Sequence, residues 1–165
     1  MRLLHRHALL VFTALAAACG GELRPFDARV FAGTWRGPWT DDAGQRGRVA
    51  LTVTDEGDAL QLACDVLGPS LPGALPATEH VAAKIRDGEA VIEDHRSRTF
   101  GSVRGVVTAD GRLAITCEGV AGPVESLHGL GSWTDQDLIV EVDVTYDGSL
   151  RTSHARVELR RGGRD

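Results

Sequence analysis

Apolar and polar residues alternate along most of this chain, and this period of two constrains the fold more than any other feature. Every second residue is apolar in the segments 49–53, 60–66, 113–117, 138–144 and 155–159. Alternate residues of a strand point to opposite faces, so each segment predicts a strand with one buried and one wetter face. No stretch of useful length has the 3.6-residue period of a helix. The sequence therefore predicts an all-β fold with almost no helix after residue 20.

Turn signals separate these segments. Asp-Gly pairs stand at 87–88, 110–111 and 147–148, with further turn residues at 41–44 and 56–58. Asp and Gly tolerate the positive φ of tight hairpin turns, so the strands are expected to follow one another as an antiparallel up-and-down meander. About ten strands are predicted, at 30–37, 46–55, 59–67, 79–86, 89–95, 101–109, 112–118, 129–134, 137–146 and 151–161. The proline-rich link 68–78 is expected to be a loop or a lid. Such a meander either stacks as two sheets or closes into a barrel, which removes its edges.

The first residues have the pattern of an export signal. A basic start (1–7) precedes an apolar run (8–15), three alanines (16–18) and Cys19. This order of segments is typical of a secretory signal, and the run is too short to span a bilayer, which needs roughly 20 residues. A cysteine after small residues resembles the lipobox of bacterial lipoproteins. That resemblance implies cleavage before Cys19 and lipid attachment to it, and two or more acyl chains give stable membrane anchoring.

Two alternatives to the lipoprotein interpretation stay open. Ala16 stands where a lipobox usually has Leu, and 16–18 also fit ordinary secretory cleavage at the same bond. The protein would then be secreted, or retained on the membrane by an uncleaved anchor. Gly20 follows Cys19, and this resembles the pattern of lipoproteins that are sorted to the outer membrane. The outer membrane is therefore the expected location in the cell envelope. The predicted organisation is signal peptide 1–18, lipid-anchored tether 19–29, one β-barrel domain 30–161 and C-terminal tail 162–165.

Composition and motifs limit the classes of function. Removal of Arg2 and Arg6 with the signal leaves 16 basic and 23 acidic residues, a net charge of −7, and no basic face suggests nucleic-acid binding. No nucleophile elbow, zinc-protease, P-loop or dinucleotide-binding motif is present. The acidic clusters 93–95 and 135–137 lack the ligand spacing of a calcium loop and are expected to be solvated turns. We therefore expect no catalysis, no metal and no cofactor, with one alternative for haem described below. The sequence does not indicate a protein partner.

Gly33-Thr34-Trp35 opens the first predicted strand, and Arg160-Arg161 end the last one. Here the chain resembles the calycins, the group that contains lipocalins, fatty-acid-binding proteins and avidins. The resemblance implies that Trp35 closes one end of a barrel and that a terminal arginine packs over its ring, a contact worth ~0.5–2 kcal/mol. It also implies a small apolar or amphipathic ligand in the lumen, near the open mouth.

A narrower resemblance covers about thirty residues at the two ends. The start 33–37 and the end 137–161 are similar to nitrobindin-type haem-binding barrels, in which the matching histidine is the proximal haem ligand. This implies haem binding by His154. Alternation puts His154 on the face opposite Val157 and Leu159, so it fits only if that face lines the lumen. Haem binding is therefore an alternative function, and a structural or assembly module of the outer membrane, with a filled core and no ligand, is another.

Cys64 and Cys117 share the apolar phase of two strands. In an oxidising envelope compartment, we expect them to form a disulfide. The alternative is two separate buried thiols. Metal binding by two cysteines is not expected, because no histidine stands at ligand spacing.

Overall fold

The computed structural model describes residues 25–67, 79–120, 124–148 and 152–162. The predicted signal, Cys19 and the link 68–78 lie outside these residues. The described elements, in chain order, are α1 (Ala28–Phe31), β1 (Gly33–Asp41), β2 (Arg46–Asp55), β3 (Ala59–Leu67), β4 (Glu79–Arg86), β5 (Glu89–Ser97), β6 (Gly101–Thr108), β7 (Arg112–Glu118), β8 (Val124–Trp133), β9 (Asp137–Tyr146) and β10 (Thr152–Arg161).

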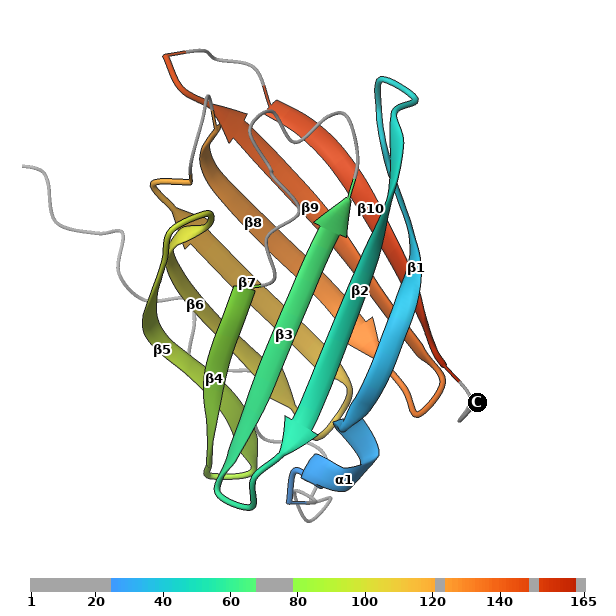
Figure 1. Ribbon diagram of the computed structural model, residues 1–165, viewed down its shortest axis with the longest axis vertical. Helices are drawn as coiled ribbons and strands as arrows, with labels where there is room; N and C mark the ends of the chain where they lie inside the picture. Colours follow the sequence, from blue (N-terminus) through green and yellow to red (C-terminus); the bar gives the residue numbers. More distant parts are fainter. Residues whose placement is uncertain (1–24, 68–78, 121–123, 149–151, 163–165) are drawn as a thin grey trace, which may run out of the picture.

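Ten antiparallel strands form one closed barrel (Figure 1). Each strand pairs with the next in the chain, and β1 pairs with β10, so no edge is left open. The all-β prediction is confirmed, and the open two-sheet sandwich is excluded. This architecture is consistent with a calycin-like fold.

Barrel closure depends on a close approach of β1 and β10. In this pair Trp35 lies opposite Arg161, and Trp39 lies opposite Val157. Gly37 lies between them, and a Cβ atom there would stand 1.8 Å from the carbonyl oxygen of Glu158. Only glycine fits this distance, so Gly37 allows the first and last strands to pair.

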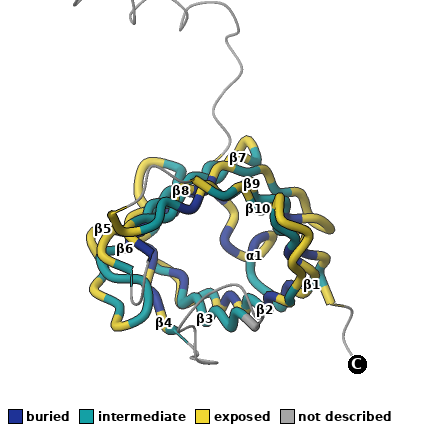
Figure 2. Tube along the Cα trace, turned by 90° about the horizontal axis from the view of Figure 1, so that it is seen from above, coloured by how far each residue is buried: buried dark blue, intermediate teal, exposed yellow. Residues whose placement is uncertain are grey.

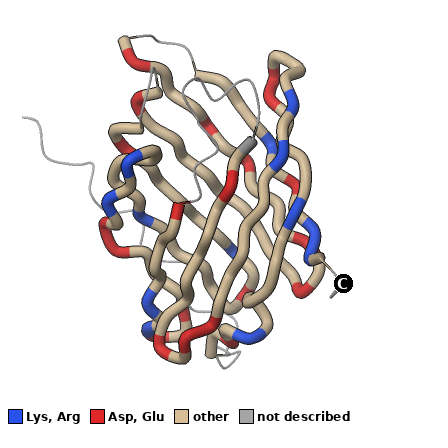
Figure 3. The backbone as a smooth tube through the Cα atoms, viewed as in Figure 1, with Lys and Arg blue, Asp and Glu red and all other residues tan. Residues whose placement is uncertain are grey.

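The two faces of the wall differ in polarity, as the alternation predicts. Figure 2 shows the wall as a closed ring with α1 across one end. Buried side chains such as Val53, Leu60 and Leu138 point inward. Charged residues are spread along the strands and at the two ends of the barrel (Figure 3), and the exposed side chain of Glu93 pairs with those of Lys84 and Arg86. Such exposed pairs add little stability each. In the described part of the chain, no helix is long and apolar enough to cross a membrane.

The main departures from the predicted boundaries lie at the end of β1, which is Asp41 rather than residue 37, and at two strand starts. β1 begins at Gly33 rather than at residue 30, because Asp27 caps the short helix α1 by accepting a hydrogen bond from the Arg29 amide (3.0 Å). Phe26 and Ala28, within the expected tether, are buried in the core. β8 begins at Val124 rather than at residue 129, with an irregular register near its start.

Candidate functional site

The lumen contains a cavity of about 280 Å³. More than half of the residues in its wall are valine, leucine or isoleucine, most of the others are also apolar, and every strand contributes to the wall. The lumen is therefore not packed shut. A structural module with a filled core would need a lumen that is packed with side chains.

An aromatic plug, defined as Phe26, Phe31, Trp35 and Trp133, closes the end of the barrel at α1. Phe31 lies at the centre of the plug, with its ring centroid 5.0 Å from that of Trp133 and 5.8 Å from that of Trp35. Phe26 packs edge-on against Trp133 at 6.0 Å. Phe31 also lines the cavity, so the plug is its floor.

Trp35 and Arg161 have the arrangement that the calycin resemblance implied. Trp35 is fully buried, and the Arg161 guanidinium carbon lies 5.4 Å from the centroid of its ring. The Trp35 indole nitrogen donates a hydrogen bond to the Phe31 carbonyl (3.1 Å), and Arg161 donates to the Ala32 carbonyl at the end of α1. Gly33, with φ +141°, leaves room for the Arg161 side chain. The Arg161 side chain thus links β10 to both α1 and β1.

Arg160 does not take part in this contact. Its side chain is on the outer face and 89% exposed, with its Nε 3.7 Å from an Asp137 carboxylate oxygen. Consecutive residues of a strand point to opposite faces, so only one of the two terminal arginines can reach the ring. The structure therefore places Arg161 over Trp35.

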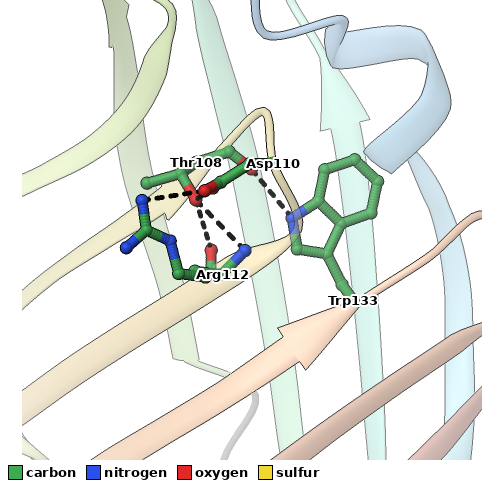
Figure 4. Close-up of polar contacts among 4 residues, drawn as sticks. All are labelled: Thr108, Asp110, Arg112 and Trp133. Carbon is green, nitrogen blue, oxygen red and sulfur yellow. Dashed lines mark hydrogen bonds and ion pairs between the residues drawn. The ribbon is translucent and has the colours of Figure 1, made fainter. Parts of the chain in front are cut away.

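Trp133 joins the plug to the β6–β7 turn, a role that sequence reasoning missed. Its indole nitrogen donates a hydrogen bond to the Thr108 carbonyl (3.1 Å). The Thr108 hydroxyl accepts from the Arg112 amide and bonds to Asp110, which pairs with the Arg112 guanidinium at 2.8 Å (Figure 4). The sequence did offer one signal for this role: Trp133 has the inward phase and stands at the end of a predicted strand.

Four polar side chains line the cavity at the opposite end, which we call the mouth. Asp41 ends β1, Glu79 begins β4, Tyr146 ends β9 and Ser153 follows the first residue of β10. Strand direction in an up-and-down barrel puts all four positions at the end away from α1. Sequence reasoning missed these residues too, although Asp41 shares the inward phase of Trp35 and Trp39. The lumen is thus an apolar cup with a polar mouth.

Glu79 is held in a defined position at the mouth. Its Oε1 accepts a hydrogen bond from the Thr99 amide (3.3 Å). Burial acts to raise the pKa of Glu79, but hydrogen bonds from Thr99 and Ser97 and the nearby His95 outweigh it, and the pKa lies below its ordinary value. Glu79 is therefore ionised at neutral pH.

Cys64 and Cys117 are free thiols in the structure, so the predicted disulfide is not formed there. Both line the cavity, but they belong to β3 and β7, which three other strands separate in the wall. Equal phase puts the two side chains in the same lumen but does not join them in a bond. Burial raises the pKa of Cys64 to about 12 and that of Cys117 to about 11. Protonated thiols are poor nucleophiles and poor metal ligands.

His154 lies on the outer face of β10, where its side chain is 68% exposed and its Nδ1 bonds to an Asp143 carboxylate oxygen. The face opposite Val157 and Leu159 is thus the outside of the barrel. His154 is not available to a haem inside the lumen. Among the described residues, no histidine lines the cavity and no group of three or more His, Cys, Asp or Glu could hold a metal ion.

No family model matches this sequence, and no curated protein matches it. Among solved structures, the chain is similar to "Structure of EF1p2_mFAP2b bound to DFHBI", with 13% sequence identity and a TM-score of 0.45. The match covers 82% of this chain and 96% of the other. The fold is therefore described by its own geometry, as a closed ten-stranded antiparallel barrel of calycin-like form.

Proposed function

We propose that this protein is a binding barrel that holds a small apolar or amphipathic ligand in its lumen and does not catalyse a reaction. The observation that supports this proposal is the cavity of about 280 Å³ with an apolar wall, a closed floor and a polar mouth. Ligand sites are concave and mostly apolar, with a few polar groups that orient the ligand, and typically measure roughly 300–1,000 Å³. A cavity just below this range suits a small ligand.

The cost of an empty core supports the same interpretation. Unfilled apolar space destabilises a protein by about 24 cal/mol per Å³. A barrel whose only role was mechanical would gain stability by filling this space with larger side chains. The wall instead has small or medium side chains at Gly129, Val142 and Ala155, all of which line the cavity.

The ligand proposal predicts binding of an uncharged fluorescent dye, N-phenyl-1-naphthylamine. The wild type is expected to bind one dye per chain saturably, with enhanced emission. Ala155→Trp places an indole in the cavity and is expected to weaken binding at least tenfold. Ala82→Trp adds the same side chain at an exposed position on the outer face of β4 and is the matched control.

A second readout needs no variant. Bound dye is expected to slow the alkylation of Cys64 and Cys117, which line the cavity, as measured by mass mapping of each cysteine peptide at pH 10, where more of each thiol is in the reactive thiolate form. Absence of dye binding, or binding that neither slows alkylation nor responds to Ala155→Trp, would rule out the lumen as a ligand site.

We propose further that the protein is anchored to the bacterial cell envelope by lipid on Cys19, with the outer membrane as its location. The signal-like segment before Cys19 supports this. Only five residues lie between Cys19 and Pro25, so the two are at most roughly 20 Å apart along an extended chain. Pro25 precedes α1, so a lipid on Cys19 would hold the plug end of the barrel near the membrane, with the mouth facing away (Figure 1).

Cys19→Ser is expected to move the protein from the membrane fraction to the soluble fraction, because two acyl chains are needed for stable anchoring. Fractionation of cells and mass spectrometry of the N-terminal peptide measure this change. Cys117→Ser is the control and should stay with the membrane. An unmodified Cys19 in the wild type would contradict the anchor without affecting the ligand proposal.

A further inference from the structure

The charged side chains that line the cavity, among the described residues, are all acidic. Asp41 and Glu79 are among the described lining residues, which include no lysine, arginine or histidine. The Arg161 guanidinium lies below the floor, over Trp35, and does not line the cavity. A ligand in the lumen would therefore meet two carboxylates at the mouth and no opposing cation among these residues.

Both carboxylates are held by backbone amides. One Asp41 carboxylate oxygen accepts from the Gln45 amide (2.7 Å) in the β1–β2 turn, and Glu79 accepts from the Thr99 amide. Neither has an ion-pair partner within the described parts of the chain. Amide donors fix the position of a carboxylate but leave its charge uncompensated, so it remains available to a cation.

The change from apolar to polar lining is abrupt. Glu79 lies opposite Cys64 in the β3–β4 register. Burial dominates the rise in the pKa of Cys64, and the charge of Glu79 contributes to it. A ligand that fills the cavity down to Phe31 thus has its apolar part against aliphatic side chains and only its outer end near the carboxylates.

On the basis of the proposed function, we infer that the lumen selects an amphiphile with a cationic head, such as an ammonium group, on a small apolar body. The apolar body fills the cup above Phe31, and the head lies at the mouth between Asp41 and Glu79. An opposite charge a few ångströms from a partly buried carboxylate is attracted strongly enough to change affinity about tenfold. The same field repels an anionic head, such as that of a fatty acid.

The inference is tested with three eight-carbon compounds that differ only in the head: octylammonium, octanol and octanoate. Each displaces N-phenyl-1-naphthylamine from the full chain at pH 8. The wild type is expected to bind octylammonium about tenfold more tightly than octanol, and octanoate more weakly than octanol. The preference should shrink as salt is added, because salt screens partly exposed charges.

The double variant Asp41→Asn/Glu79→Gln removes both charges and keeps amide oxygens that can accept the backbone hydrogen bonds. We expect octylammonium affinity to fall to that of octanol, with octanol affinity within twofold of the wild type, which also shows that the lumen is intact. Glu118→Gln is the matched control: it removes one carboxylate at the same end of the barrel, but from the outer face of β7.

Each outcome has one meaning. Equal affinity for octylammonium and octanol in the wild type would overturn the charge inference and leave the ligand proposal standing. An equal loss in Glu118→Gln would overturn it too, because the preference would then come from net charge. Failure of both the dye and octanol to bind would overturn the proposed function itself.

Discussion

Replacement of Trp35 by alanine is expected to lower the free energy of unfolding by about 3–5 kcal/mol, the range for deleting a buried large aromatic side chain. Trp35 is fully buried, stacks against Phe31 and donates a hydrogen bond to the Phe31 carbonyl. Its removal also takes away the ring that faces the Arg161 guanidinium. Urea denaturation followed by far-UV circular dichroism measures the loss.

Arg36→Ala is the control for this prediction. Arg36 is the next residue of β1, but it is exposed on the outer face, where substitutions usually change stability by less than about 0.5 kcal/mol. Trp35→Phe should fall between the two, because it keeps a ring against Phe31 but loses the hydrogen bond. A loss below about 1 kcal/mol in Trp35→Ala would show that the plug does not stabilise the barrel.

The second large effect concerns alkaline pH. Above the ordinary thiol pKa of about 9, unfolded Cys64 and Cys117 lose their protons, whereas the folded protein retains them because the pKa values are raised to about 12 and about 11. The unfolded state then binds fewer protons, so stability falls as pH rises. Each thiol contributes about 1.4 kcal/mol per pH unit. We expect the free energy of unfolding to fall by about 4 kcal/mol between pH 9 and pH 11.

The composition of the chain makes this measurement clean, since it contains one lysine and one tyrosine. Urea midpoints at pH 8, 9, 10 and 11 give the slope. The double variant Cys64→Ala/Cys117→Ala removes both thiols and should show a nearly flat profile over this range, whatever its stability at pH 8. A wild type with constant stability from pH 9 to pH 11 would contradict the burial of these thiols.

Local pattern was enough to predict most of the strands. β2 and β3 have the predicted bounds, because the alternation ends abruptly at the turn residues 56–58. The beginning of β8 was hidden, because the register shifts between Val124 and Ser126 and interrupts the alternation there. The four residues of α1 are too few to show a helical period, so the helix and the core position of Phe26 could not be predicted.

The site could be predicted less completely from the sequence, because it depends on which strands face one another across the lumen. Alternation correctly separated the face of His154 from that of Leu159, but it could not say which face was inside until the barrel was known to close. The shared phase of Cys64 and Cys117 gave no distance between them. Asp41 and Glu79 line the same mouth because β1 ends and β4 begins at that end of the barrel.

The pairing of β1 with β10 has a consequence for how the chain folds. More than a hundred residues separate Trp35 from its partner Arg161, so this contact carries a large loop-closure entropy, and topologies with many such contacts fold slowly. Until β10 has emerged and docked, β1 presents an unpaired edge to other chains, a ready template for aggregation. The ten residues of β10 thus protect the edge of β1, and a chaperone that shields the exposed edge would act before β10 has paired with it.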